Sequence, residues 1–192
     1  PVLEDLGQKD MSSADTLSEF LTWGIKNYPA KHYMVVLMDH GGGWTGAFTN
    51  DAAGSSGHIM SNPKIAEAFA KTQQETGVKP DVVHMAACLM ASTESAYELK
   101  DATNYLVASE EMGTTLGFKY GPLLDKLEQT LVDGKELTGE SIAKTIVDYY
   151  AYKPAAFATK SAIDMSKIDN VKNALAGFAQ KLRKTDTGKE VL

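Results

Sequence analysis

The sequence predicts an α/β fold with a mostly parallel central sheet. Short apolar runs alternate with longer segments of helical periodicity, which is typical of strands and helices joined in βαβ units. Two of these runs, at 32–39 and 81–87, end next to His40 and Cys88. A length of 192 residues is enough for one well-packed domain, so we expect a single domain over 1–192. Because the chain begins without a methionine, we also expect it to be a fragment of a longer protein.

Six segments have the apolar spacing of an amphipathic helix. The first ends before Pro29, because a residue that precedes proline disfavours helix. The second starts with Asn62 as its cap and Pro63 in the first helical position. Gly77 and Gly134 close the second and the fourth helix. The predicted helices cover residues 14–26, 62–77, 92–101, 121–132, 138–152 and 167–184.

We expect the first and the last helix to bury a continuous apolar face. The residues on that face of the first helix are Leu17, Phe20, Leu21 and Ile25. The residues at core spacing in the last helix are Ile168, Val171, Leu175, Phe178 and Leu182.

Four apolar runs predict strands, and the segment after the first strand predicts a loop. The strands cover residues 32–39, 81–87, 105–108 and 156–163. Residues 41–57 (GGGWTGAFTNDAAGSSG) have neither helical nor strand periodicity. We therefore expect a long exposed glycine-rich loop there, and long loops inside compact domains are often functional.

Cys88 is the only cysteine, and it lies where a buried strand gives way to a helix. A lone cysteine is more often a small buried hydrophobic residue than a reactive one. Its place at a strand end, before helical amides that favour a thiolate, indicates a reactive thiol instead. Ligands of parallel sheets bind outside the carboxyl ends of the strands, so His40 at the other strand end is expected to be its partner.

His40 precedes three glycines, and this distinguishes it from the other histidines. Those occupy a strand start, a loop and a strand interior: His32, His58 and His84. Backbone amides that no side chain obstructs can form an oxyanion hole, where one donor contributes ~2.7 to 4 kcal/mol in acyl transfer. We expect the N–H groups of Gly41 and Cys88 to have this role.

The glycine run also permits a phosphate loop or the oxyanion loop of a serine esterase. A phosphate loop is disfavoured, because neither GxGxxG nor GxxxxGK[ST] occurs. An esterase needs a GxSxG nucleophile elbow, and the nearest candidate, at 54–57, has the wrong spacing. The histidines and the cysteine show no metal-binding spacing, so no metal site is predicted.

Composition argues against several classes of partner. The net charge is -6, and the 19 basic residues form no stripe, which disfavours nucleic acid and anionic membranes. No run approaches the ~18 apolar residues of a membrane span. A single cysteine excludes an internal disulfide. We expect a monomer without a membrane span.

Two motifs resemble the clostripain family of cysteine peptidases. They are FLTWGIKNYPAKHYMVVLMDHGGGW and ACLMASTESAYELKDATNYLVASEE, and the resemblance covers roughly residues 10–165. It implies a caspase-like α/β/α sandwich, a catalytic dyad of His40 and Cys88, and cleavage of peptide or protein substrates after basic residues. For some members it further implies self-cleavage between the motifs and dependence on calcium. It also implies a bacterial protein that is secreted or associated with the cell envelope.

Two departures from the family pattern concern the residues expected to hold a basic substrate side chain. The family usually has Asp-Ala-Cys where this chain has Ala-Ala-Cys at 86–88, and Trp-Asp-Tyr where it has Phe-Lys-Tyr at 118–120. Ala86 and Lys119 thus replace two acidic side chains of the substrate pocket, and a substrate cation without a counter-charge is costly there. We expect weak cleavage after Arg or Lys, with a small, polar or acidic residue preferred. The alternative is a binding or regulatory domain that has lost efficient turnover.

Overall fold

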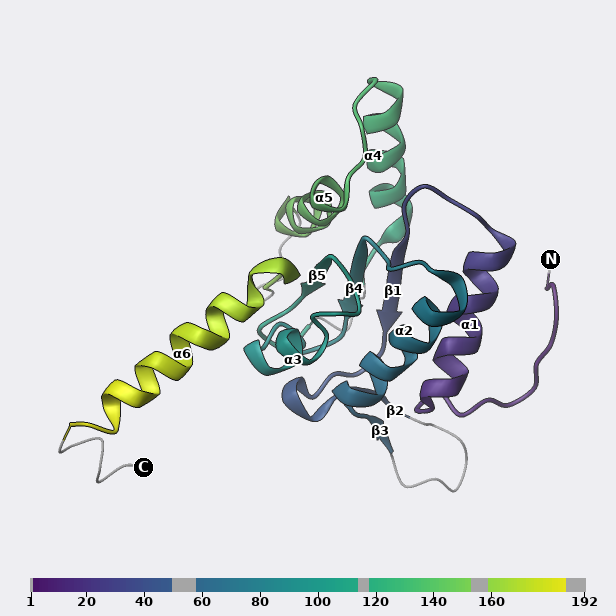
Figure 1. Ribbon diagram of the computed structural model, residues 1–192. Helices are drawn as coiled ribbons and strands as arrows, with labels where there is room; N and C mark the ends of the chain where they lie inside the picture. The colour runs from purple at the N-terminus through teal and green to yellow at the C-terminus, as the bar shows by residue number, and fades with distance from the viewer. Residues whose placement is uncertain (1, 50–57, 114–117, 153–158, 186–192) are drawn as a thin grey trace.

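Four strands form the central sheet of the computed structural model, which describes residues 2–49, 58–113, 118–152 and 159–185 (Figure 1). In sheet order they are β1 (Met34–Met38), β4 (Val82–Ala86), β5 (Tyr105–Ala108) and β6 (Ser161–Asp164). The first three are parallel, and β6 is antiparallel to β5. The predicted α/β class with a mostly parallel sheet is confirmed.

Helices cover both faces of the sheet, which makes an α/β/α sandwich (Figure 1). The helices are α1 (Ala14–Asn27), α2 (Asn62–Thr76), α3 (Thr93–Glu98), α4 (Tyr120–Val132), α5 (Gly139–Tyr152) and α6 (Ile168–Leu182). One apolar cluster joins the sheet to α1, α2 and α3, and a second joins it to α4 and α5. Within the described ranges, no helix is long and apolar enough to cross a membrane.

Strand β4 lies between β1 and β5, and it is buried on both faces because helices pack against each face of the sheet. Side chains alternate along a strand, so Val83 and Met85 enter the cluster with α1, α2 and α3. Val82 enters the cluster with α4 and α5, and the fully buried His84 lies on that same face. The strand that carries the candidate nucleophile is therefore held rigidly from both sides.

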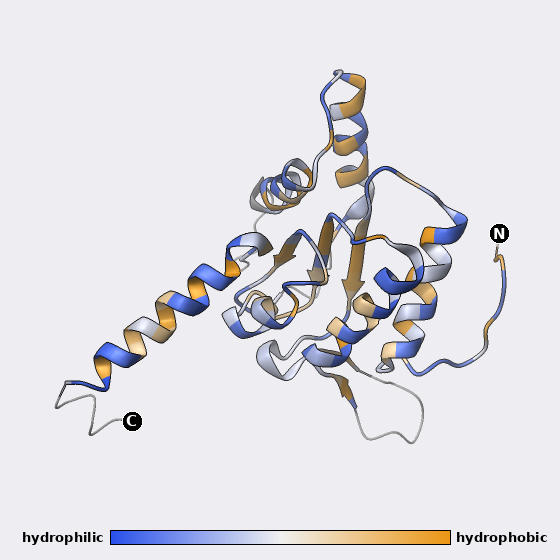
Figure 2. Cartoon of the chain, in the orientation of Figure 1, coloured by the Kyte–Doolittle hydropathy of each residue, from blue (hydrophilic) through white to orange (hydrophobic). Residues whose placement is uncertain are grey.

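The last helix, α6, extends away from the body of the molecule (Figure 1). Ile168 at its start is buried, but Val171, Leu175 and Phe178 are 42%, 51% and 64% exposed. The prediction that these three contribute to the core is wrong, although their apolar stripe is visible (Figure 2). Helical periodicity identifies an apolar face but not what packs against it. Phe20 of α1, also predicted to be buried, is exposed for the same reason.

Part of the glycine-rich segment that was expected to be an exposed loop is folded against the body. It contains the 3₁₀ helix η1 (Gly43–Thr45) and the strand β2 (Ala47–Thr49), which pairs with β3 (Ile59–Met60). Ala47 and Phe48 belong to the apolar cluster with α1 and α2. Residues 50–57 lie outside the described residues.

The predicted final strand differs in its position. It was expected at 156–163, and β6 instead covers Ser161–Asp164. Residues 153–158 lie outside the described part of the chain. After β6, a 3₁₀ turn, η2 (Met165–Lys167), leads into α6.

Asn62 is a buried link between three segments and not the helix cap that the sequence predicts. The cap position falls one residue earlier, at Ser61. The Asn62 amide group donates to the carbonyl oxygen of Gly43 and to Oγ of Ser95, both at 3.1 Å. It thereby connects η1, α2 and α3 behind the glycine run.

Replacing Asn62 by alanine is expected to destabilise the fold by about 1 to 3 kcal/mol, because it removes the buried amide group that donates to both Gly43 and Ser95. Equilibrium urea unfolding of the two proteins measures this difference in free energy of unfolding. Asn27→Ala is the matched control. The Asn27 side chain also donates to a carbonyl, that of Trp23 at 2.8 Å, but it is exposed, so its loss should change stability by less than about 0.5 kcal/mol. Equal losses of unfolding free energy in the Asn62→Ala and Asn27→Ala proteins would contradict the role given to Asn62.

Candidate active site

The ends of β1 and β4 bring His40 and Cys88 to one edge of the sheet. The two strands are parallel neighbours, with Met38 opposite Ala86. His40 and Cys88 each follow that pair by two residues. Because the carboxyl ends of parallel strands meet at the same edge, both residues leave the sheet at the same place.

Gly41 lies directly against the backbone of Cys88. A Cβ atom on Gly41 would lie 2.1 Å from the carbonyl oxygen of Cys88 and 2.9 Å from its nitrogen. Both neighbours are backbone atoms, which cannot turn aside as the end of a flexible side chain could. Glycine is therefore required at this position, and the contact fixes the two strand ends against each other.

The chain turns sharply immediately after Cys88. Leu89 has φ 64°, a left-handed conformation that is uncommon for a residue with a branched side chain. Hydrogen bonds to the segment after β5 hold this turn: Leu89 N–H donates to the Glu111 carbonyl at 3.2 Å. Strained backbone of this kind is concentrated at functional sites. The Cys88 side chain is half-buried, and its Sγ accepts a hydrogen bond from Gly113 N–H at 3.1 Å.

The backbone around His40 is held by a short antiparallel bridge. The His40 carbonyl accepts from Phe48 N–H at 3.0 Å, and Gly41 pairs with Ala47. The His40 side chain itself is exposed. Within the described part of the chain, the N–H groups of Gly41 and Cys88 donate to no other group. Two backbone donors thus remain available beside the thiol.

The two residues predicted for the substrate pocket have different surroundings. Ala86 is the half-buried last residue of β4, on the same sheet face as His84. Lys119 is exposed at the N-terminal cap position of α4. Its neighbours Phe118 and Tyr120 turn toward His84, with ring centroids 4.9 and 5.8 Å from the imidazole.

An aromatic cluster with a lysine lies beside His84, and it was not predicted from the sequence. Phe118 packs between His84 and the α5 residues Tyr149 and Tyr150, with centroid distances of 5.5 Å to Tyr149 and 6.1 Å to Tyr150. Lys160 Nζ lies 5.0 Å from the centroid of the Tyr150 ring. The signal was a single charged residue inside an apolar run, AAFATKSAI.

Burial dominates the electrostatics of this cluster. It lowers the pKa of His84 to about 3, with a smaller contribution from the charge of Lys160, so His84 is neutral. Burial also lowers the pKa of Lys160 to about 8, although attraction to Glu110 and Cys88 opposes the shift. Burial and the negative charge of Cys88 raise the pKa of Tyr150. Lys160 and Tyr150 are thus in contact, and Cys88 acts on both of them through its charge.

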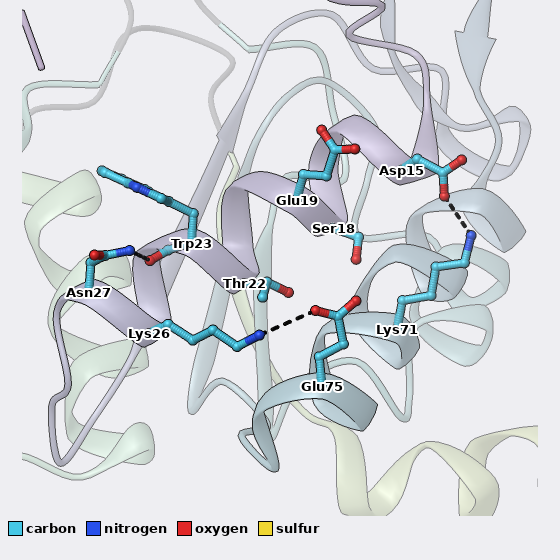
Figure 3. A pocket seen from close by; sticks show the side chains of 9 residues that line it. All are labelled: Asp15, Ser18, Glu19, Thr22, Trp23, Lys26, Asn27, Lys71 and Glu75. Carbon is cyan, nitrogen blue, oxygen red and sulfur yellow. Dashed lines mark hydrogen bonds and ion pairs between the residues drawn. The ribbon is translucent and has the colours of Figure 1, made fainter. Parts of the chain in front are cut away.

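A polar surface cleft between α1 and α2 is lined by ion pairs, Lys71 with Asp15 at 2.7 Å and Lys26 with Glu75 at 3.6 Å (Figure 3). None of the residues at the strand ends lines it. No group of three or more His, Cys, Asp or Glu among the described residues could hold a metal ion.

Three solved structures are similar to this fold. The chain matches a secreted C11 cysteine protease of Bacteroides thetaiotaomicron, called iotapain, with a TM-score of 0.60, 22% identity, and coverage of 90% of this chain and 49% of that one. A secreted C11 protease of the same organism, in complex with an irreversible peptide inhibitor, matches with a TM-score of 0.65 and 24% identity. The match covers 91% of this chain and 50% of that one. An inactive zymogen C11 protease of Parabacteroides distasonis matches with a TM-score of 0.61 and 24% identity. The match covers 92% of this chain and 46% of that one. These likenesses agree with the caspase-like sandwich.

Sequence comparison gives the same family. Clostripain of Hathewaya histolytica is 21% identical over 229 residues, which cover 96% of this chain and 41% of the relative. The chain thus spans half or less of the length of the relatives it matches. The clostripain family pattern matches residues 2–191, and the chain therefore belongs to the clostripain family.

Proposed function

We propose that this chain is the catalytic part of a cysteine endopeptidase, with Cys88 as the nucleophile and His40 as its partner. The observation that carries the proposal is the backbone contact between Gly41 and Cys88, which fixes the two strand ends side by side. Family membership supports the peptidase class. A similar structure is that of a secreted cysteine protease in complex with an irreversible peptide inhibitor.

The first half of the proposed reaction forms a thioester. The Cys88 thiolate attacks the scissile carbonyl carbon, and the carbonyl oxygen takes the negative charge. The N–H groups of Gly41 and Cys88 donate to that oxygen, since neither has another acceptor among the described residues. When the carbon–nitrogen bond breaks, the leaving amine takes a proton from His40. The Gly113 N–H keeps the sulfur in place.

The second half releases the acid product. A water molecule gives a proton to His40 and attacks the thioester carbon. The same two amides stabilise the new oxyanion, and its collapse expels the Cys88 thiolate. The exposed position of His40 suits this step, because both the substrate and water must reach the imidazole.

The pocket lacks the acidic side chains that would hold a basic substrate residue. Ala86 offers no charge on the face that it shares with His84. Lys119 brings a positive charge where the family pattern has a carboxylate. A substrate Arg or Lys would therefore lose its hydration without gaining a counter-charge. We infer that the residue preceding the scissile bond is not basic.

Replacing Cys88 by alanine is expected to abolish turnover of a fluorogenic peptide library and labelling by peptide electrophiles. His40→Ala should lower kcat/KM by about 10² to 10⁴, the usual range for a lost general acid and base. His58→Ala is the matched control, since His58 is also an exposed histidine. Full turnover by the Cys88→Ala protein would refute the mechanism.

Gly41→Ala is expected to reduce kcat/KM by at least about 100-fold, because the added Cβ would separate the two strand ends. Gly24→Ala in α1 is the control, since a Cβ there meets no atom within 4 Å. Steady-state kinetics measure the loss, and circular dichroism shows whether the variants remain folded. A folded Gly41→Ala protein with normal activity would show that this contact does not position the site.

Profiling at the residue before the scissile bond is expected to show poor cleavage after Arg and Lys. The physical reason is the missing counter-charge at Ala86 and Lys119. The measurement is the relative kcat/KM of peptides that differ only at that residue. A clear preference for Arg or Lys would overturn this interpretation of the pocket while leaving the dyad intact.

A further inference from the structure

Lys160 lies at the same sheet edge as Cys88. Because β6 is antiparallel to β5, with Ser161 opposite Ala108, the start of β6 lies beside the carboxyl end of β5. The residues on both sides of Lys160 are held there. The hydroxyl of Thr159 accepts from Glu110 N–H at 3.0 Å, and the hydroxyl of Ser161 donates to the Glu110 carboxylate.

Lys160 also lies on the same sheet face as Ala86. Ile163 packs in the cluster with α1, α2 and α3, and alternation along the strand places residues 160 and 162 on the opposite face. The ring of Tyr150, from α5 on that opposite face, lies beneath the Lys160 ammonium group. Ala86 lies on this face as well, because it follows His84 by two residues in β4 and side chains two residues apart point to the same face.

The Lys160 ammonium group is largely removed from water without a close carboxylate. Among the described residues, Lys160 forms no ion pair with an acidic side chain, and Glu110 acts on it only as a more distant charge. The Tyr150 ring compensates for part of the lost hydration through a cation–π contact. A cation held in this way near a nucleophile is typical of a binding site for an anionic group.

We propose that Lys160 is the specificity residue of the pocket, and that it binds the carboxylate of an Asp or Glu side chain directly before the scissile bond. This inference rests on the proposed peptidase function and deepens it. An acid at position 86 would be attracted to Lys160 and would compete for it. The alanine there leaves the ammonium group free to pair with the substrate, and Tyr150 forms the wall of the pocket.

Matched peptides with Glu or Gln, and with Asp or Asn, before the scissile bond test this proposal, since each pair differs only in charge. The unmodified protein should show a kcat/KM for the acidic peptide about 10- to 100-fold above that for its amide. Lys160→Met should reduce this ratio to within about 3-fold, and Lys160→Arg should retain most of it. Lys167→Met is the control, because Lys167 is an exposed lysine beyond the other end of β6, and this change should leave the ratio unchanged.

The pH dependence of the same ratio gives a second measurement. The pKa of Lys160 is about 8 in the free protein, so its charge is present below that pH and is lost above it. The preference for the acidic peptide should therefore decline as the pH rises through about 8. Cys88 and His40 act on both peptides of a pair, so their contribution cancels in the ratio.

The other titratable groups near Lys160 should not cause the preference for the acidic peptide to fall near pH 8. They are Glu110, His84, Tyr120 and Tyr150. The pKa of His84 is about 3, and burial raises those of both tyrosines, that of Tyr120 to about 12. Glu110 faces Lys160 from the segment after β5, and Glu110→Gln shows whether its carboxylate contributes to the ratio.

Peptide binding to the Cys88→Ala protein separates this inference from the proposed function. Fluorescence polarisation should give tighter binding of the acidic peptide, and the double variant with Lys160→Met should lose the difference. If the unmodified protein has no turnover but this binding preference is found, the catalytic proposal fails and the pocket assignment stands. Turnover without a preference for the acid, binding of neither peptide, or a preference that depends on Lys119 instead of Lys160 would overturn the inference.

Discussion

The contact between the backbones of Gly41 and Cys88 is the constraint on which the candidate site depends. Two neighbouring parallel strands bring their ends to one edge, but strand spacing alone does not bring the backbones beyond the strand ends into contact. Here the absence of a Cβ on Gly41 lets the two backbones touch, so that two backbone N–H groups and the two candidate catalytic residues come from one small region. The rigidity of β4, buried on both faces, fixes the position of this contact.

The region beside the thiol contains a largely buried ammonium group, that of Lys160, and burying this charge costs stability. An ammonium group loses hydration when it is covered, and its lowered pKa reflects that cost. An apolar side chain at position 160 would pack against the aromatic rings without this penalty. The ring of Tyr150 lies against the Lys160 side chain, and the ring of Phe118 stacks with that of Tyr150. Such a combination is usual where proteins recognise ligands.

Much of the fold could be predicted from the sequence, because apolar periodicity and helix-ending residues are local signals. The strand over 105–108 and most helix borders are of this kind. What could not be predicted depended on partners distant in the chain. The stripe at Val171 and Leu175 has the spacing of a core helix, but spacing contains no information on what covers it. The role of Lys160 was not predicted, because it depends on the contact with an aromatic ring of α5. The role of Asn62 was not predicted, because it depends on three segments that meet around this side chain.

The hydroxyl of Thr159 joins two parts of the site that are distant in the sequence. It accepts from the N–H groups of Glu110 and Glu111, at 3.0 and 3.1 Å. The carbonyl of Glu111 in turn accepts from the N–H of Leu89, in the turn after Cys88. The strand that bears the lysine and the turn that bears the thiol are therefore one cooperative unit. Opening of either would release the other, so the amide protons of Leu89 and Glu111 should exchange with solvent at matched rates.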